Sequence, residues 1–519
     1  MKRSLILFTA LLFFYSYNVF SQSWTEKSED ETYTARHEFG FVQAGDKFIL
    51  FGGRESPQVL DVYDYTTDTW SNGGMAPIEF NHFQAIIYEG LVWVIGSFKD
   101  NDFPIEEPAD YIYMYNPANE QWIQGMEIPA SRKRGSAGLV VYNNKFYLVA
   151  GNTIGHDGGY VSYFDEFDPA TGVWTQLTNA PRTRDHFHAV TFNDKLYAIG
   201  GRLSGGTGGV FEPLVPEVDV YDFTTEMWST LDASKNIPTT RAGLAVVVFD
   251  DEIYAIGGES PGSLHDDVEA YDPVLNSWST KNSLNYARHG IQAIVSGDGI
   301  HITCGSHYSG EIIRNYEYYG TDNPQGSPNV NSTFEADETT KSFTYTELEG
   351  SVPVQVNLSN SLGTTGTYID MIELTGSTDY TLVQSYDNRL VGVGGNLMVN
   401  ITLNDTTKPT NNATLVITYN NSSTINVLLE GTLDTGLSTE TENLNHIKLY
   451  PNPVKNSFSV YKNITDLTIY DITGKLIKEF NGNFTRNYLF NISNLPRGIY
   501  FTKIKDENGR HFITKLVKH

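Results

Sequence analysis

Arginine recurs at one position of a repeated pattern in the first three hundred residues of this chain. An apolar strand follows each arginine, and a glycine-containing corner comes about seventeen residues later. A guanidinium group presents donors in a planar fork, which suits recognition of a carboxylate. If the repeats converge, these side chains form a positive spot that binds an acidic ligand. The predicted binding residues are Arg36, Arg134, Arg184, Arg241 and Arg288, with Asn81–His82 at this place in the second copy.

A structural role is the alternative for each arginine. Its guanidinium would then donate to main-chain carbonyls and to a carboxylate of its own repeat, such as the aspartate of the Tyr63–Asp64 pair. The sequence leaves both interpretations open. The convergence of five arginines favours ligand binding.

Other chemistry-bearing patterns are weak. In the segment from Arg184 to His188, strand alternation would place His186 and His188 on one face, and we expect a structural role for them. The run Asp100–Asn101–Asp102 lacks the later ligands that calcium needs. Motifs for a serine nucleophile, a zinc-binding helix or a phosphate loop do not occur. We therefore expect no metal and no cofactor.

Composition narrows the functional classes. The formal net charge of −27 argues against a nucleic-acid partner, because such partners need basic surfaces that neutralise phosphates. The single cysteine, Cys304, excludes an intrachain disulfide and a cysteine-rich metal framework. Abundant aromatic residues and turn-forming residues indicate an all-β protein.

The elements that position the arginines form six copies of a four-stranded unit. Each copy carries an apolar strand pair, a glycine corner and a closing tryptophan, the pattern of a β-propeller. The sixth copy has no closing tryptophan of its own, so we expect Trp24 to supply the outer strand of the last blade and to close the ring. The tryptophans of the series are Trp24, Trp70, Trp122, Trp174, Trp228 and Trp278.

Long loops follow several glycine corners. Antiparallel pairing predicts that they emerge on the same face as the start of each inner strand, where binding residues usually lie on a rigid scaffold. These loops carry Lys99, Asp100, Asp102, His156, Asp157, Tyr160, Phe211, His265, His307 and Tyr308.

The six copies described above resemble the kelch repeat, whose pattern is arginine, an apolar strand, a glycine pair, Tyr-Asp and tryptophan. The resemblance covers about 300 residues and implies a six-bladed kelch β-propeller over 22–322. By that resemblance the arginines lie near the mouth of the central channel, and arginines of some kelch adaptors hold acidic peptides there. Kelch propellers also serve as enzymes and lectins, so the fold alone does not give a function.

Binding of an acidic glycan or peptide is the function that the sequence favours. The alternative is an enzyme of the sialic-acid mutarotase (N-acetylneuraminate epimerase) type, which would need a glutamate and an arginine facing a sugar acid. Glu212 and Glu217 lie on the longest loop but cannot be placed opposite an arginine from the sequence. A copper-radical oxidase would need a Cys–Tyr crosslink, whereas Cys304 has the surroundings of a core residue.

Residues 327–433 contain alternating strands separated by Asn, Ser, Thr and Gly turns, which predict a two-sheet sandwich. The segment resembles immunoglobulin-like modules of bacterial surface proteins. A polar stretch, 434–446, is predicted to be a linker.

Residues 447–519 closely resemble the type A C-terminal sorting domain of the type IX secretion system of the Bacteroidetes. This small β-sandwich carries a net charge of +7, on a chain whose remainder is strongly acidic. The resemblance implies export by the type IX machinery to the cell surface or the medium. The residues that carry it are Tyr450, Pro451, Asn452, Pro453, Gly474, Lys475, Gly498 and Tyr500.

The first 21 residues resemble a secretory signal. Two basic residues precede a short apolar run from Leu5 to Phe14, and Val19–Ser21 form a plausible cleavage site. The apolar run is too short for a membrane span, so we expect no transmembrane segment after cleavage.

Overall fold

The computed structural model describes residues 22–27, 30–54, 58–205, 209–308, 311–435 and 447–519. The predicted signal peptide, 1–21, and most of the predicted linker, 434–446, lie outside the described residues. Within the described part of the chain, no helix is long and apolar enough to cross a bilayer. The secondary structure of these described residues is almost entirely strand, with three short 3-10 helices, at Ala130–Arg132, Ala233–Lys235 and Glu347–Glu349.

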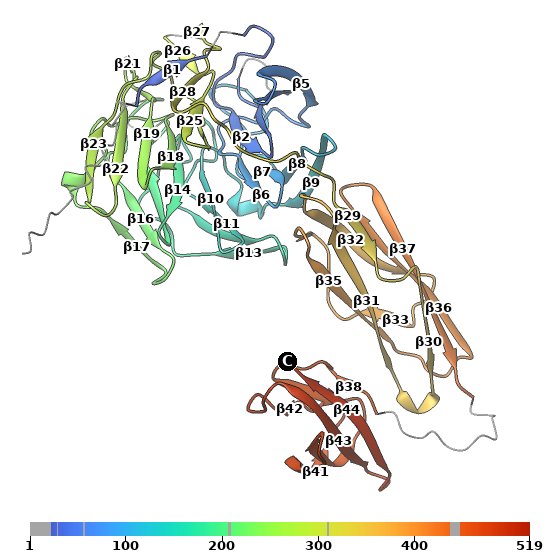
Figure 1. The fold of residues 1–519 in the computed structure, drawn as a ribbon. Helices are drawn as coiled ribbons and strands as arrows, with labels where there is room; N and C mark the ends of the chain where they lie inside the picture. Colours follow the sequence, from blue (N-terminus) through green and yellow to red (C-terminus); the bar gives the residue numbers. More distant parts are fainter. Residues whose placement is uncertain (1–21, 28–29, 55–57, 206–208, 309–310, 436–446) are drawn as a thin grey trace, which may run out of the picture.

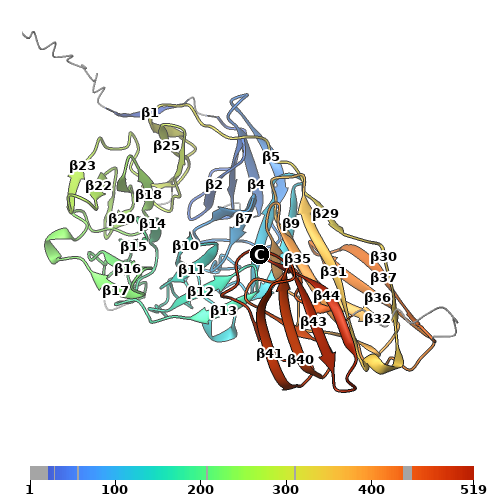
Figure 2. The ribbon, with the colours of Figure 1, turned by 60° about the horizontal axis from the view of Figure 1, so that its bottom comes forward.

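Six four-stranded antiparallel sheets form the propeller (Figures 1 and 2). From the axis outward, blades 1 and 2 contain β2 (Gly40–Ala44), β3 (Lys47–Phe51), β4 (Val59–Asp64), β5 (Thr69–Met75), then β6 (Ile86–Tyr88), β7 (Leu91–Val94), β8 (Tyr111–Asn116) and β9 (Gln121–Glu127). Blades 3 and 4 contain β10 (Gly138–Tyr142), β11 (Lys145–Val149), β12 (Phe164–Asp168), β13 (Val173–Gln176), then β14 (His188–Phe192), β15 (Lys195–Ile199), β16 (Asp219–Asp222) and β17 (Met227–Thr230). Blades 5 and 6 contain β18 (Ala245–Phe249), β19 (Glu252–Ile256), β22 (Val268–Asp272), β23 (Ser277–Thr280), then β24 (Ile294–Ser296), β25 (Gly299–Ile302), β28 (Glu317–Gly320) and β1 (Trp24–Glu26).

The sixth blade is completed by the other end of the chain. Strand β1 pairs antiparallel with β28, and Trp24 lies opposite Tyr319. The predicted closure through Trp24 is therefore confirmed. The pairing removes a free sheet edge and ties the first described residues to the last blade.

The Tyr-Asp pair and the tryptophan recur because they face each other across the outer strands. Tyr63 is registered opposite Trp70, and their ring centroids are 5.1 Å apart. Tyr221 and Trp228 have the same pairing at 5.2 Å. Cross-strand aromatic pairs of this kind stabilise a sheet.

The glycine corners of blades 3 and 6 begin one residue earlier than predicted from the sequence. The paired positions with positive φ are Ala150–Gly151 in blade 3 and Cys304–Gly305 in blade 6. The sequence alone predicts these two corners one residue later, at Gly151–Asn152 and Gly305–Ser306. With this correction, all five repeat arginines lie at the same distance before the second corner residue, and Cys304 is a buried corner residue.

A two-sheet β-sandwich follows the propeller. One sheet contains β29 (Thr333–Ala336), β31 (Val352–Ser361), β35 (Asn396–Leu403) and β33 (Tyr380–Leu382). The other contains β30 (Thr340–Tyr345), β37 (Ser423–Leu433), β36 (Thr410–Tyr419), β32 (Thr367–Thr375) and β34 (Arg389–Val391). Strand β30 pairs parallel with β37, and all other pairs are antiparallel. The immunoglobulin-like resemblance of this sandwich stays a prediction.

The sandwich contacts the propeller on the face of the hairpin turns. The amide of Gly366 donates to the carbonyl of Glu89, in the β6–β7 turn, at 2.7 Å, and Leu390 donates to Pro169, in the β12–β13 turn, at 2.7 Å. Tyr368 is buried and its hydroxyl accepts from the amide of Met126 at 2.9 Å. The opposite face, where the inner strands begin, carries the long loops and is called the loop face below.

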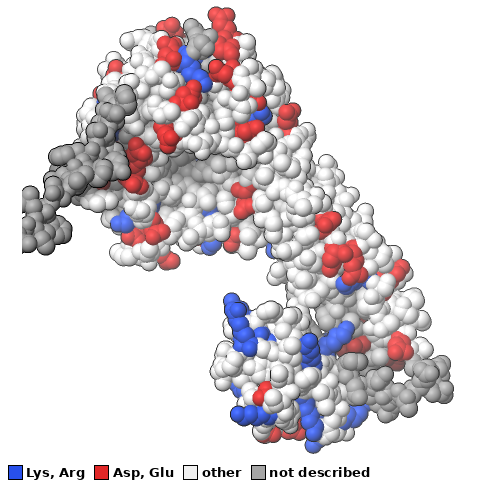
Figure 3. Space-filling view, in the orientation of Figure 1, with Lys and Arg blue, Asp and Glu red and all other residues white. Residues whose placement is uncertain are grey.

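The C-terminal domain is a small β-rich unit. It contains β38 (Leu449–Tyr450), β39 (Ser457–Val460), β40 (Ile464–Asp471), β41 (Leu476–Phe484), β42 (Phe490–Asn491), β43 (Gly498–Asp506) and β44 (His511–Lys518). The side-chain oxygen of Asn452 accepts from the amide of Val517, and its Nδ2 donates to the carbonyl of Lys515. These two hydrogen bonds join the Tyr-Pro-Asn-Pro segment to the last strand. Figure 3 shows basic side chains gathered on this domain and mostly acidic ones on the propeller.

Candidate functional site

The loop face is closed at its centre by a ring formed from one residue of each blade. Each ring residue lies just before the inner strand and has a positive φ, between 49° and 65°. The ring residues are Glu38, His82, Ser136, His186, Gly243 and Gly290.

Main-chain hydrogen bonds join the ring from blade to blade. The amide of His82 donates to the carbonyl of Glu38 at 3.0 Å, and that of Ser136 to the carbonyl of His82 at 2.7 Å. Gly290 donates to Gly243 at 2.8 Å, and Glu38 donates to Gly290 at 2.6 Å. The ring borders a small cavity of about 40 Å³ on the propeller axis. The positions are therefore fixed by backbone bonding, whatever side chain they carry.

The side chains on the ring differ from blade to blade. Blades 1, 2 and 4 contribute Glu38, His82 and His186, whereas blades 5 and 6 contribute only glycine. A fourth side chain, His156, reaches the same place from the loop after the corner of blade 3. Potential ligand atoms of these four residues all lie within 4.8 Å of one another.

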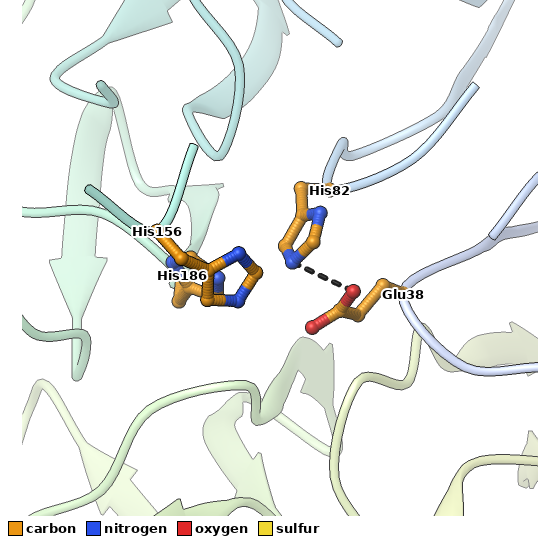
Figure 4. A group of neighbouring side chains, drawn as sticks. All are labelled: Glu38, His82, His156 and His186. Atoms are coloured by element: carbon orange, nitrogen blue, oxygen red, sulfur yellow. Dashed lines mark ion pairs between the residues drawn. The ribbon is translucent and has the colours of Figure 1, made fainter. Parts of the chain in front are cut away.

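The three imidazoles and the carboxylate face one centre (Figure 4). The His82 ring centroid lies 4.5 Å from that of His186 and 4.8 Å from that of His156. Nε2 of His82 is 2.7 Å from an Oε of Glu38. One carboxylate and three imidazoles are a donor set that divalent transition ions accept.

Each imidazole is held from behind through Nδ1. The partners are Asn81 for His82 at 2.5 Å, Asp185 for His186 at 2.5 Å, and Glu106 for His156 at 2.8 Å. Two of the three partners are carboxylates. Such contacts fix both the ring orientation and the tautomer.

Burial sets the charges of this cluster. It lowers the pKa of His156 to about 4 and lowers the pKa values of His82 and His186 as well. Burial would raise the pKa of Glu38, but neighbouring positive charge outweighs it and places the pKa well below the usual range. Of the groups that lower it, Arg54, paired with this carboxylate at 2.7 Å, still carries its charge when the imidazoles are neutral. At neutral pH the cluster therefore contains neutral imidazoles beside an ionised carboxylate.

Two arginines flank the cluster, one residue after the second corner residue of their blades. Arg54 pairs with Glu38 at 2.7 Å and also with Glu106. Arg202 pairs with Glu259 at 2.5 Å. The mouth of the propeller is thus a dense network of paired charges and not an open positive spot.

The five repeat arginines lie below this network, buried inside their own blades. Arg288 illustrates the arrangement: it donates to the carbonyls of Cys304 and Asn315, both at 2.8 Å, and pairs with Glu317 at 2.5 Å. The side chains of the five are at most 2% exposed, so the structure gives them a packing role and does not bring them together at a surface. The five pairs are Arg36–Asp61, Arg134–Asp165, Arg184–Asp219, Arg241–Glu269 and Arg288–Glu317.

Two details differ from the sequence interpretation. The carboxylate partner is not the aspartate of the Tyr-Asp pair; in blade 1 it is Asp61, which precedes that pair on β4. In blade 2 the arginine position is held by Phe80, whose carbonyl accepts from Gly53 as that of Arg184 accepts from Gly151. His82 therefore occupies the ring position, two residues further along.

Of the candidate residues, the structure places only His82 in the cluster at the mouth. Glu38 and the ligand-facing role of His186 were missed, because strand alternation was applied to residues that precede the strand. Counting two residues on from each repeat arginine would have found both. His156 was noted only as a loop residue, since no repeat position marks it.

The loops of neighbouring blades pack on one another around the mouth. The amide of His156 donates to the carbonyl of Pro104, which joins the loops of blades 2 and 3, at 2.8 Å. Two short hairpins, β20–β21 (Glu259–Ser260 and Ser263–Leu264) and β26–β27 (Ser306–His307 and Glu311–Ile312), complete the rim in blades 5 and 6. Among the described propeller residues, the four most exposed aromatic side chains all lie in these loops: Phe103, Tyr160, Phe211 and Tyr308.

The fold and its ring of inner strands define a kelch-type six-bladed propeller. The model of the KLHDC2/KLHL20/DRC7 Kelch-repeats domain matches residues 10–201 and 125–305. The chain belongs to the kelch-repeat family. The predicted all-β architecture and the kelch resemblance are confirmed.

A second family model, the secretion system C-terminal sorting domain, matches residues 448–519. This confirms the predicted sorting domain, and with it export through type IX secretion to the cell surface or outside. The eight motif residues from Tyr450 to Tyr500 lie within the matched segment.

The similar proteins share the propeller. The Kelch-like protein terF of Aspergillus terreus is 27% identical over 294 residues, which are 54% of this chain and 60% of that protein. Beta-scruin of Limulus polyphemus is 25% identical over 53% of this chain and 31% of its own length, and the human Kelch-like protein 23 is 23% identical over 51% and 44%. The chain therefore spans about a third to three fifths of these relatives. A solved structure, that of YjhT, is 16% identical with a TM-score of 0.49, over 57% of this chain and 97% of that one.

Proposed function

We propose that this exported protein binds a carbohydrate at the loop face of its propeller, and that the ligand is a glycan with an acidic group. Exposed aromatic side chains on four different loops carry this proposal. Their exposed fractions are 58% for Phe103, 37% for Tyr160, 47% for Phe211 and 63% for Tyr308.

Large aromatic side chains are costly to leave in water, so their restriction to one face indicates a contact surface. An aromatic ring offers a flat apolar face, and sugar rings present C–H faces that pack on it, while their hydroxyls need polar partners. The loop face supplies both, because the aromatic rim surrounds a mouth of histidines and carboxylates.

The acidic group has a candidate partner at the rim. The guanidinium of Arg54 lies 5.7 Å from the centroid of Phe103, and its side chain is 15% exposed. A ligand stacked on Phe103 therefore comes close to this arginine, and its carboxylate can share the arginine with the protein carboxylates already bound. Arg202, beside Phe211, is buried like the repeat arginines. The acidic-ligand hypothesis is retained with Arg54 in place of the five buried arginines.

A glycan array that also displays acidic peptides tests this proposal on the purified full chain. We expect the protein to bind acidic glycans on the array. The Phe103→Ala and Tyr308→Ala variants should bind them about tenfold more weakly, since one stacking contact contributes about 1.4 kcal/mol. The matched control is Tyr488→Ala, which removes a half-exposed aromatic side chain from the sorting domain. Binding of peptides alone, or glycan binding that ignores both rim variants, would overturn the proposal.

The sialic-acid mutarotase alternative has a direct test with the same protein. Proton NMR can follow the exchange between the two anomers of sialic acid. A rate above that in buffer would replace the binding proposal by an isomerase, and a rate equal to buffer would end the alternative.

A further inference from the structure

We infer that Glu38, His82, His156 and His186 form a binding site for one divalent transition-metal ion, with Zn²⁺ as the best match. The four residues come from four successive blades and meet on the axis of the propeller. This inference shares the mouth with the proposed glycan site, and only its last step, the role of the ion in recognition, rests on the proposed function.

The spacing of the four side chains suits one ion. Tetrahedral ligands at the usual Zn–N and Zn–O distances lie about 3.4 Å from one another. Here all potential ligand atoms lie within 4.8 Å of one another, and the His82–Glu38 pair is already at 2.7 Å. Small side-chain movements would therefore bring all four into one coordination sphere.

The tautomers present lone pairs to the centre of the cluster. The side-chain amide of Asn81 donates through Nδ2 to the carbonyl of Asp100, so its Oδ1 faces His82 and Nδ1 of His82 must be the donor. Asp185 and Glu106 are carboxylates, so Nδ1 of His186 and of His156 donates as well. In the neutral form of each ring the lone pair therefore lies on Nε2, and this is the form that binds metal.

One of these nitrogens has no partner, and another has only the carboxylate of the cluster. Nε2 of His186 is fully buried and has no hydrogen-bond partner within the described residues. Nε2 of His82 lies 2.7 Å from a carboxylate oxygen of Glu38, a contact that is an ion pair when the imidazole is protonated and opposes two lone pairs when it is neutral. His82 and His186 are 5% and 7% exposed. A cation bound by these groups removes the repulsion of the neutral form and the cost of the unpaired buried acceptor of His186.

The rigid ring fixes this arrangement. The main-chain bonds of the ring position Glu38, His82 and His186, and blade 3 adds only the small side chain of Ser136. Blades 5 and 6 place only glycine there, and a Cβ at Gly290 would lie 2.9 Å from the Cγ of Glu38. Glycine in blade 6 therefore allows the close approach of the Glu38 side chain.

The bound ion would also favour an acidic ligand. Three neutral imidazoles and one carboxylate leave a net charge of +1 on a Zn²⁺ complex. The carboxylate of a glycan on the aromatic rim would then be attracted by this positive charge. This step explains how a strongly acidic protein can recognise an acidic sugar.

Metal binding is tested on the full chain after treatment with a chelator and dialysis. We expect one equivalent of Zn²⁺ to rebind, measured by elemental analysis and calorimetry, and Co²⁺ to give the absorption bands of a nitrogen-rich, four- or five-coordinate site. Mg²⁺ and Ca²⁺ should not compete, because they prefer oxygen ligands. His156→Ala and Glu38→Gln should weaken Zn²⁺ binding by more than about 100-fold, and Glu106→Gln, behind His156, by about 10- to 100-fold.

The matched control is His265→Ala, which removes a loop-face histidine outside the cluster and should leave the affinity unchanged. Thermal unfolding of each variant with and without Zn²⁺ separates misfolding from loss of the site, since only an intact site is stabilised by the ion. No bound equivalent in the wild type, or equal affinity in His156→Ala, would overturn the inference. Glycan binding that persists in metal-free protein would leave the proposed function intact; Zn²⁺ binding without any glycan would refute that function alone.

Discussion

The arginine position and the ring position, two residues apart in every repeat, show opposite behaviour. Five of six blades keep arginine at the first, and each arginine is buried against a carboxylate of its own blade. The second position keeps only its positive φ, and its residue is Glu, His, Ser, His, Gly or Gly. The arginine position is regular because every blade but the second uses the same packing there. The ring position is free to vary because only its backbone conformation is needed for the fold, and candidate functional residues are therefore sought there.

Removing a repeat arginine should have the largest effect on stability. Arg288→Ala leaves the buried carboxylate of Glu317 without its counter-ion and removes the donor to the carbonyls of Cys304 and Asn315, so we expect a loss of about 3–5 kcal/mol. All seven tryptophans lie between Trp24 and Trp278, so intrinsic fluorescence during denaturation reports on the propeller.

Arg288→Ala/Glu317→Ala is the control for this experiment. Removing the stranded carboxylate as well should restore part of the stability. A fully stable Arg288→Ala variant would mean that the arginine position serves binding after all, and the contrast between the two positions would be lost.

The sequence predicted the fold closely because repeats report on packing. The closing role of Trp24 followed from a missing tryptophan in the sixth copy, and the sorting domain followed from a dense local motif. The mouth was harder to predict. It depends on non-local contacts such as His156 against Glu106, fifty residues apart, which no local pattern encodes.

A second comparison is between the histidines at the mouth and His301, which lies inside blade 6. Burial lowers the pKa of His301 to about 4, and its Nδ1 is 2.9 Å from the hydroxyl of Tyr316. Asp322 raises this pKa and Lys27 lowers it, both by smaller amounts than burial. Phe48 and Tyr318 pack beside the ring.

A pH series of unfolding experiments tests the role of His301. The unfolded chain binds this proton near pH 6.5 and the folded chain near pH 4, so stability is present above pH 6.5 and is lost as the pH falls toward 4. This histidine alone would contribute up to about 3 kcal/mol. Between about pH 4.5 and 6.5 the free energy of unfolding of the wild type should rise with pH, in part because the unfolded chain binds one more proton at His301. His301→Gln should reduce this slope by the contribution of one proton, and an unchanged slope would contradict the assignment.

The smallest expected effect is a gain in stability from a substitution at the ring position of blade 3. Ser136 has a φ of 50° and a buried hydroxyl without a hydrogen-bond partner among the described residues. Glycine adopts this conformation freely, so Ser136→Gly should raise propeller stability by up to about 1 kcal/mol and leave Zn²⁺ affinity unchanged. Ser136→Ala separates the two causes, because it removes the hydroxyl but keeps the strained Cβ. If Ser136→Gly lowers the denaturation midpoint measured by fluorescence, the serine stabilises the ring. The ring position of blade 3 would then need its particular residue for stability, as the arginine position does.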